Sequence, residues 1–302
     1  MKALPAVVFL LSAVSQLPAA SILYDSFNYS PVGAQVSSAG APSWTLRNAG
    51  QEDPKIASGS LSYPGLQTAS GDNSVIFNGV APAAGVSGRL LDQIYNVNNA
   101  TTLYYSLTLQ VSNITIGDWG GSGNFLSGSF MMGFSQDTTG APAAGSAAAP
   151  LLIRTGDPTN ASGVANDFQG FQLGTGVTAV AGTRVFDGTH VYLPNQTLFL
   201  VLSYTFGPNA MDDVAKLWVN PIPGSLEGDN TAVVTATGVA DVTNNQIQAF
   251  FLRNNSVEPA STLIDDLRVG TSWADVTPAP EPSTFVLCAL SALGFLGRRS
   301  RR

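Results

Sequence analysis

The sequence predicts an all-β protein, folded as an antiparallel β-sandwich or jelly roll. Apolar and polar residues alternate with a period of two along several segments, as they do in strands that bury one face. Clusters of Gly, Pro, Asn and Asp separate these segments, and the chain of 302 residues contains 31 Gly and 18 Pro. No segment carries the apolar stripe of a long amphipathic helix.

Two segments carry the clearest strand patterns. In residues 103–111, apolar residues at every second position alternate with Tyr104, Ser106, Thr108 and Gln110, which predicts a strand with one buried face. Residues 197–206 are apolar on both faces through their middle. This second pattern predicts a central strand of a sheet.

Shorter strands are expected along the rest of the chain. They cover residues 22–27, 60–63, 74–77, 129–134, 151–154, 168–173, 191–193, 214–219, 232–235, 247–253 and 263–269. The tract 138–150 consists mainly of Ala, Gly, Thr and Pro. We expect this low-complexity tract to form a flexible surface loop.

The first 20 residues have the pattern of a secretory signal peptide. Lys2 precedes an apolar run over residues 6–14, and small residues follow Pro18 as far as Ala20. The run is too short to span a membrane, and the small residues are typical of a cleavage site. We therefore expect export through the Sec translocon, with cleavage near Ala20.

The last 23 residues combine three features in order. Pro280, Glu281 and Pro282 come first, followed by Ser283 and an apolar segment over residues 284–297. The chain then ends with a basic cluster, Arg298, Arg299, Arg301 and Arg302. This order predicts a short apolar helix whose cationic end stays on the cytoplasmic side of a membrane. A permanent span needs about 20 apolar residues, so we expect a transient anchor.

This tail resembles the PEP-CTERM sorting signal of Gram-negative bacteria. The resemblance implies recognition by an exosortase, a membrane-embedded processing enzyme. It also implies delivery from a transient inner-membrane anchor to the outer membrane or the extracellular matrix, in bacteria that make exopolysaccharide. A simple tail anchor is the alternative. The only cysteine, Cys288, lies within the tail, so the exported body can form no disulfide.

Residues 21–279 form the body, which we expect to be one domain because it shows no internal repeat and no linker. The body opens with Leu23-Tyr-Asp-Ser-Phe27, and the segment 264–277 closes it. These two segments and the strand pattern resemble PEP-CTERM proteins with a concanavalin A-like lectin/glucanase sandwich. A fold of this class permits carbohydrate binding but does not establish it.

The charge balance of the body differs from that of the whole chain. The chain has 13 basic and 20 acidic residues, of which the two ends hold Lys2, the four terminal arginines and Glu281. The body therefore carries 8 basic and 19 acidic residues, a formal charge of −11. Such a charge argues against nucleic acid and other anionic partners.

The body lacks the common catalytic motifs. Its glutamates, Glu52, Glu227 and Glu258, do not form the Glu-x-Asp-x-x-Glu strand motif of glucanases of this fold class. His190 is the only histidine, and no Gly-x-Ser-x-Gly elbow is present. We expect His190 to be a strand residue at the sheet surface, and zinc sites of His/Cys type are excluded by count. A protein without enzymatic activity is therefore expected.

Two aspartate pairs are candidates for cation binding. Asp212 and Asp213 precede the expected strand 214–219, and Asp265 and Asp266 lie within residues 263–269. Carboxylates are the hard ligands that Ca²⁺ prefers, so Asp212 and Asp213 are a candidate calcium site. The favoured alternative is that the aspartates accept turn hydrogen bonds. Strand alternation would place Asp266 and Arg268 on one face as an exposed pair.

Trp119 is the best candidate for sugar stacking. It lies in a Gly-rich segment with Asp118 and Asn124, which would present the ring beside hydrogen-bonding groups. Trp218 alternates with Lys216 and is expected to pack on the sheet. We interpret the chain as an exported surface or matrix protein with exopolysaccharide as its candidate ligand. A glycoside hydrolase or lyase with an unrecognised Asp pair, and a coat protein without a ligand, are the alternatives.

Overall fold

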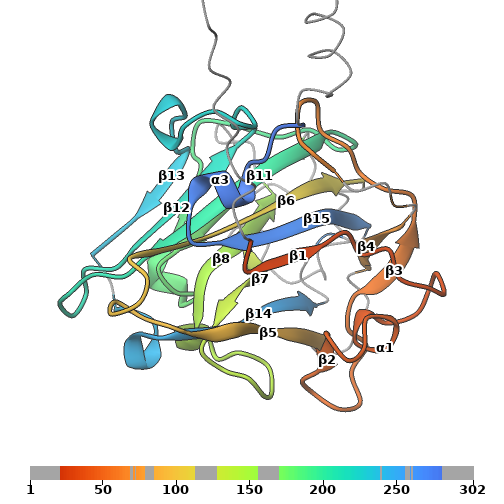
Figure 1. Ribbon diagram of the computed structural model, residues 1–302, viewed down its shortest axis with the longest axis horizontal. Helices are drawn as coiled ribbons and strands as arrows, with labels where there is room; N and C mark the ends of the chain where they lie inside the picture. Colours follow the sequence, from red (N-terminus) through yellow and green to blue (C-terminus); the bar gives the residue numbers. More distant parts are fainter. Residues whose placement is uncertain are drawn as a thin grey trace, which may run out of the picture.

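The computed structural model describes residues 21–68, 71, 73–78, 85–112, 128–155, 170–238, 240–255, 259 and 261–280. These residues form two antiparallel sheets, one of eight strands and one of seven, stacked as a sandwich (Figure 1). The predicted antiparallel β-sandwich is confirmed. The apolar helices expected at the two ends lie outside the described residues. No helix in the described part of the chain has both the length and the apolar character that a membrane crossing requires.

The eight-stranded sheet contains the two strands that the sequence marks most clearly. Its order is β13 (Val234–Ala236), β12 (Val214–Val219), β11 (Thr197–Thr205), β6 (Thr102–Val111), β15 (Thr262–Gly270), β4 (Asn73–Phe77) and β3 (Lys55–Ser58), and β1 (Leu23–Asp25) also pairs with β15. β11 and β6 lie inside the sheet and pair along nine residues, Thr197 to Thr205.

The seven-stranded sheet forms the opposite layer. Its order is β10 (Arg184–Phe186), β9 (Phe171–Gly176), β8 (Ala147–Thr155), β7 (Ser129–Ser135), β14 (Ile247–Asn254), β5 (Gly85–Tyr95) and β2 (Thr45–Leu46). The helical segments are short: α1 (Val36–Ala39), α3 (Trp273–Val276) and the 3-10 turns η2 (Ala144–Ser146), η3 (Ala181–Thr183), η4 (Glu227–Asp229) and η5 (Thr243–Asn245).

The core lies between the sheets and follows the predicted alternation. Along β6, residues 103, 105, 107, 109 and 111 all belong to the main buried cluster. Tyr105 packs edge-on against Phe134 and Phe250 of the facing sheet, with ring centroids 5.2 and 5.0 Å away. Its hydroxyl donates to the backbone oxygen of Ala149 at 2.8 Å, so the centre of the core joins the two layers by packing and by a hydrogen bond.

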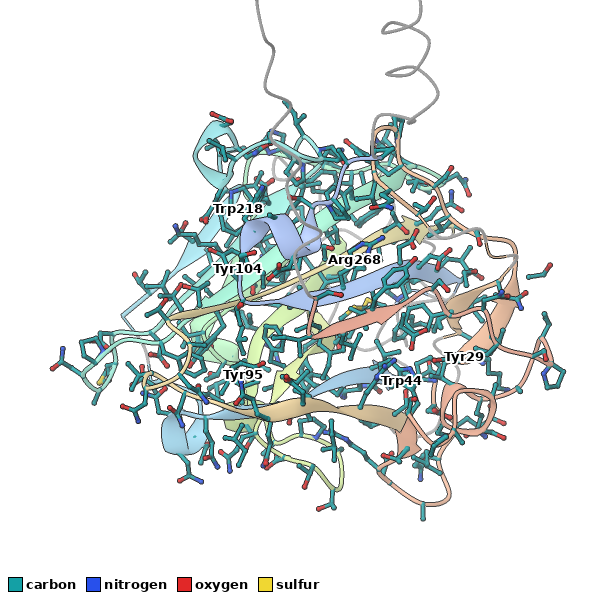
Figure 2. The ribbon with its side chains drawn as sticks, in the orientation of Figure 1. Tyr29, Trp44, Tyr95, Tyr104, Trp218 and Arg268 are labelled. Carbon is teal, nitrogen blue, oxygen red and sulfur yellow. The ribbon has the colours of Figure 1, made fainter. Side chains whose placement is uncertain are left out.

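A buried carboxylate joins the two sheets at one end of the sandwich. Asp25 of β1 accepts hydrogen bonds from the Phe27 amide, the Tyr29 hydroxyl and the Trp44 indole at 2.7–2.8 Å. It also forms a 2.7 Å ion pair with Arg89 of β5, in the other sheet. Tyr29 and Trp44 lie close together there (Figure 2). Each group that the carboxylate contacts is thereby fixed relative to β1.

The two segments that bracket the body in sequence are neighbours in space. β1 pairs antiparallel with β15, and Tyr24 lies opposite Arg268. The Arg268 guanidinium stacks 4.1 Å from the Tyr24 ring centroid, while the Tyr24 hydroxyl donates to Asp266 at 2.8 Å. The two segments that bracket the body therefore form one structural unit of the eight-stranded sheet.

The expectation of an exposed Asp266–Arg268 pair is wrong. The pairing of β15 with β6 shifts register between Asp265 and Arg268, and Asp266 has a positive φ of 52°. This bulge breaks the alternation. Asp265, Asp266 and Arg268 are 2%, 2% and 8% exposed. Burial and the nearby Asp266 charge raise the pKa of Asp265 to about 7.

Several local predictions are also wrong. Residues 60–63 form no strand, and residues 191–193 contain only an isolated bridge at Tyr192. The tract 138–150, expected to be a flexible surface loop, contains η2 and the start of β8, where residues 147–149 are fully buried. Alanine is small enough to be buried between two layers, so this tract packs despite its low complexity.

Four strands escaped prediction: β2, β3, β5 and β10. β5 is the longest strand of the fold's described part, with 11 residues. β2 pairs with β5 only at Ser87 and Gly88, and Leu90 and Ile94 of β5 are 62% and 45% exposed. An edge strand with exposed apolar residues does not show the period-two pattern of a half-buried strand.

Replacing Asp25 by Asn should destabilise the fold strongly. The amide nitrogen of the new side chain would face the hydrogen-bond donors that the Asp25 carboxylate now accepts from. Arg89 would also lose its charged partner, and for a buried pair this loss costs about 3 kcal/mol or more. Urea denaturation of D25N would measure this loss. The exposed Glu52, paired with Lys55 at 2.8 Å, supplies the control E52Q, for which we expect a change within about 1 kcal/mol. Equal losses for D25N and E52Q would contradict the assigned role.

The raised pKa of Asp265 predicts a pH dependence of stability. The folded state holds the Asp265 proton more tightly than the unfolded chain does. Its contribution is therefore complete below the ordinary pKa of about 4 and is lost as the pH rises through 7. Urea denaturation at pH 5 and pH 8 should show a smaller difference for D265N than for the wild type. The same pH difference in both proteins would refute this assignment.

Candidate functional site

The outer faces of the two sheets are built differently. On the eight-stranded sheet, an apolar cluster covers the outer face: Leu66, Tyr104, Phe199, Val201, Trp218, Trp273 and Val276. Trp273 and Val276 belong to α3, which lies over this sheet (Figure 1), and Trp218 is 2% exposed. Trp218 therefore packs on the sheet, as predicted.

The outer face of the seven-stranded sheet carries arginines instead. Leu151 and Ile153 of β8 point into the main core, as do Phe250 and Leu252 of β14. Arg154 and Arg253 follow Ile153 and Leu252 and therefore point outward. On β9, Phe171 belongs to the main core, so its neighbour Gln172 points outward, and so does Gly176, four residues further along the strand. Arg184 of β10 lies opposite Gly176 and therefore also points outward. We call the outward residues Phe130, Arg154, Gln172, Arg184, Phe186 and Arg253 the arginine face.

Two of these arginines lie on phenylalanine rings. The Arg154 guanidinium is 4.2 Å from the centroid of Phe186, and that of Arg253 is 4.3 Å from the centroid of Phe130. Cation–π stacking of this kind holds a guanidinium in a defined plane. Glycines allow the approach of Phe186, because a Cβ at Gly128 or Gly174 would collide with its ring.

Arg184 and Arg253 bind the same short backbone segment. The Arg184 Nη1 donates to the Gly128 oxygen at 2.6 Å, and the Arg253 Nη1 donates to the Phe130 oxygen at 3.0 Å. Burial, followed by the charge of Arg253, lowers the pKa of Arg184. Two cations are therefore held near each other in a partly desolvated setting.

Gln172 places an unpaired donor on this face. Its Oε1 accepts from the Arg154 Nε at 2.8 Å, and since arginine is only a donor this contact fixes which end of the amide is the oxygen. The Nε2 is buried and has no hydrogen-bond partner, and Gln172 is 1% exposed. An unsatisfied buried donor costs about 1–3 kcal/mol, which an acceptor from a ligand would recover.

Carboxylates are absent from the strands that form this face. β7, β8, β9, β10 and β14 contain no Asp or Glu and three of the body's eight basic residues, Arg154, Arg184 and Arg253. The basic side chains of these five strands are therefore all arginines, and they lie on the outer face of one sheet.

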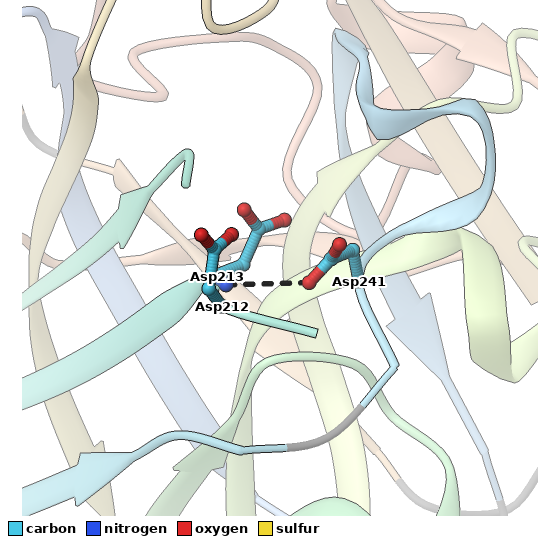
Figure 3. Close-up of side chains that lie close together, drawn as sticks. All are labelled: Asp212, Asp213 and Asp241. Atoms are coloured by element: carbon cyan, nitrogen blue, oxygen red, sulfur yellow. Dashed lines mark hydrogen bonds between the residues drawn. The ribbon is translucent and has the colours of Figure 1, made fainter. Parts of the chain in front are cut away.

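The predicted aspartate pair at 212–213 lies within a larger acidic cluster. Asp212, Asp213 and Asp241 each offer an oxygen within 4.8 Å of the others (Figure 3). Their hydrogen bonds serve the local turn. Asp213 accepts from the Gly207 amide and the Tyr204 hydroxyl, and Asp241 accepts from the amides of Met211 and Asp213.

Burial is the main cause of a raised pKa for Asp213, and the nearby charges of Asp241 and Asp212 add to it. The three carboxylates are the described group that could hold Ca²⁺, and the turn hydrogen bonds already account for their convergence.

His190 does not lie in a strand, so that expectation is wrong, although its side chain is 59% exposed. Its Nδ1 lies 2.7 Å from the buried Asp187, which also accepts from Thr189 and Tyr192. The hydrogen bonds lower the pKa of Asp187 although burial, the largest single influence, opposes them. An exposed imidazole that a carboxylate holds in one orientation has the arrangement of a general base, with the imidazole as the group that accepts the proton.

The predicted ligand residues Trp119, Asp118 and Asn124 lie outside the described residues, as do Glu281, Pro282, Ser283 and the terminal arginines of the tail. Pro280 is the last described residue and is exposed. Sequence reasoning missed the arginine face, since its arginines come from three strands far apart in the chain.

No protein-family model and no curated protein matches the sequence. Among solved structures, the alginate lyase Aly36B in complex with alginate trisaccharide is similar over 84% of this chain and 99% of its own, at 14% identity and TM-score 0.48. The carbohydrate recognition domain of Emp46p covers 83% and 99% at 11% identity and TM-score 0.40. Lectin II from Ulex europaeus covers 83% and 99% at 10% identity and TM-score 0.39. At this level of similarity, ligand and activity have to be inferred from the residues of this chain.

Proposed function

We propose that this chain is an exported surface or matrix protein whose β-sandwich binds polysaccharide on the arginine face. The observation that carries the proposal is the contrast between the two outer faces. An apolar cluster with two tryptophans covers the outer face of the eight-stranded sheet. The outer face of the seven-stranded sheet instead combines phenylalanine rings with fixed arginines and the unpaired amide of Gln172.

The chemistry of this face suits a sugar chain. Aromatic rings pack against the C–H faces of sugars, and Phe130 and Phe186 are only partly buried. Arginine and glutamine donate hydrogen bonds to hydroxyl and carboxylate oxygens. A face that spans several rigid strands would bind an extended polymer without having to reorganise, which limits the entropic cost of binding.

A polysaccharide-active hydrolase or lyase remains the alternative function, favoured by the Asp187–His190 pair. An enzyme would release new reducing ends from a polymer that it binds. Such turnover, if lost in H190A, would replace the binding proposal by the enzymatic one.

The export route belongs to the same proposal. The signal-peptide pattern of residues 1–20 and the tail over 280–302 support secretion, followed by exosortase processing and release to the outer membrane or the matrix. The concanavalin A-like resemblance supports a carbohydrate-related role for the body between them.

Mass spectrometry of the mature protein from its native host tests this route. We expect an N-terminus near Ser21 and loss of the terminal arginines, because the exosortase would cleave near Pro280. An intact chain that ends at Arg302 would contradict processing, whatever ligand the body binds.

Replacing Phe186 by Ala should weaken polysaccharide binding about tenfold, since the ring both offers a stacking surface and supports Arg154. Affinity electrophoresis through gels that contain different polysaccharides would measure the change. Val185, the neighbour that faces the other side of β10 and is 39% exposed, supplies the control V185A. Equal binding by F186A and V185A, both folded, would exclude this face as the site.

A further inference from the structure

We infer that the anchored body rests on the lipid surface through the turn between β12 and η4, whose exposed Ile222 and Leu226 enter the headgroup layer. We call residues 222–226 the apolar turn. The inference rests on the proposed export route, in which the apolar segment 284–297 is a transient membrane anchor. It adds the surface that the body presents to that membrane.

The apolar turn carries the two most exposed large apolar side chains in the part of the chain that the structure describes. Leu226 is 71% exposed and Ile222 is 64% exposed. The Ser225 amide donates to the Ile222 oxygen at 3.2 Å, so one tight turn brings the two residues together. Single apolar residues scattered over a surface are ordinary, whereas two on one projecting turn suit contact with an apolar medium.

Hydrogen bonds hold the apolar turn in this position. Gly224 has a φ of 77°, as the third residue of a type II turn requires. The Asn230 side chain accepts from the Ile222 amide at 3.0 Å and donates to the Leu226 oxygen at 2.8 Å. The Trp273 indole donates to the backbone of the turn at 3.0 Å. A fixed backbone therefore presents both apolar side chains to the outside.

The chain leaves the body against this turn. The Gly224 amide donates to the Thr277 oxygen at 2.7 Å, and a Cβ at Gly224 would lie 2.7 Å from that of Ala279. Pro280, the last described residue, is exposed. In Figure 1 this exit and the segment that follows β12 lie at the upper side of the molecule, while β5 lies at the lower side.

The linker from this exit to the apolar segment is short. Only residues 281–283 separate Pro280 from the segment 284–297, and a chain spans at most about 3.6 Å per residue. Pro280 would therefore lie within about 14 Å of the hydrocarbon once the segment is inserted. The headgroup layer fills about 5–8 Å of that distance, so the side of the body that carries the apolar turn has to meet the headgroups.

The charges around the apolar turn suit a neutral lipid surface. Glu227 accepts from the Tyr104 hydroxyl at 2.8 Å and lies 4.0 Å from Lys216, and Asp229 accepts from the Leu226 amide at 3.2 Å. Two carboxylates and one ammonium leave a slight negative balance. We therefore expect contact with zwitterionic lipids and no gain from anionic ones.

A second copy of the chain fits the apolar turn less well. A stable protein interface buries about 20–30 residues on each side, and this turn offers two exposed large apolar side chains. A lipid surface needs no complementary shape, and its gain grows with the apolar area that enters it.

Quenching by lipid tests the inference. Full-length protein would be reconstituted into phosphatidylcholine vesicles with and without a nitroxide on the lipid headgroups, and labelled with a fluorophore on one cysteine per sample. Cys288 carries the label in the tail. In a C288S background, G228C carries it in η4, where an added Cβ meets no atom within 4 Å, and L90C carries it on β5. We expect quenching at positions 288 and 228 and at least threefold weaker quenching at position 90.

Removal of the two apolar side chains separates contact from tethering. In protein labelled at position 228, I222S/L226S should reduce the quenching about twofold. Its melting temperature should stay unchanged, because both side chains are exposed. L90S removes a side chain that is 62% exposed on the other sheet and should leave the quenching as it was.

Each other outcome overturns a defined part. Quenching at position 288 alone, or equal quenching at positions 228 and 90, overturns the inference while the anchoring tail stands. Unchanged quenching in I222S/L226S, or the same loss in L90S, also overturns it, because the tether alone would then account for the proximity. Fluorescence at position 228 that responds to protein density and not to the nitroxide overturns it in favour of contact between copies. No quenching at position 288 overturns the proposed anchor itself.

Discussion

The buried carboxylate of Asp25 is the interaction on which the closure of the sandwich depends. β1 has only three residues, too few for backbone pairing alone to hold it on the edge of β15. Asp25 adds an ion pair to Arg89 of the facing sheet and hydrogen bonds to Tyr29 and Trp44. A buried charge is stable only when such partners surround it, so the same interaction also requires these elements to stay in place. β15 pairs with β6, β4 and β1. Holding β1 in place through Asp25 therefore also fixes the middle of the eight-stranded sheet.

With its layers fixed in this way, the molecule can use its two outer faces differently. Trp218, Trp273 and Tyr104 cover the eight-stranded sheet, and Trp273 contacts the other two rings edge-on. That cover seals the outer side of β6 and β11, whose residues Phe199 and Val201 are apolar and buried. The seven-stranded sheet has less apolar cover, a small cluster around Phe251 and Val86. The rest of that face is therefore available for the arginines and their supporting rings.

The sequence predicted the regular part of this fold well and the irregular part poorly. β6, β11 and β12 follow from period-two or continuous apolar patterns, because interior strands with neighbours on both sides must bury alternate or all side chains. β5 lies mostly at the edge of its sheet, and the bulge at Asp266 inverts the alternation of β15. The local sequence pattern therefore predicted neither the strand β5 nor the burial of Asp266 and Arg268. The burial of residues 147–149 depends on a facing sheet, which low complexity cannot reveal.

The candidate site was harder to predict for a related reason. Arg154, Arg184 and Arg253 lie 30 and 69 residues apart in the sequence, and only the strand order β10-β9-β8-β7-β14 brings them to one face. A weak signal was present, since Arg154 and Arg253 each end an apolar strand whose preceding residue is expected to point inward.

Most of the described acidic residues lie outside the strands of the two sheets. Among the described strands, carboxylates occur only on β1, β5 and β15, at Asp25, Asp92, Asp265 and Asp266. Asp25, Asp265 and Asp266 are buried and hydrogen-bonded, and the remaining described carboxylates lie in turns, in loops and in the short helical segments η4 and α3. The five neighbouring strands β10, β9, β8, β7 and β14 thus contain arginines but no carboxylate of their own, in a body whose formal charge is −11.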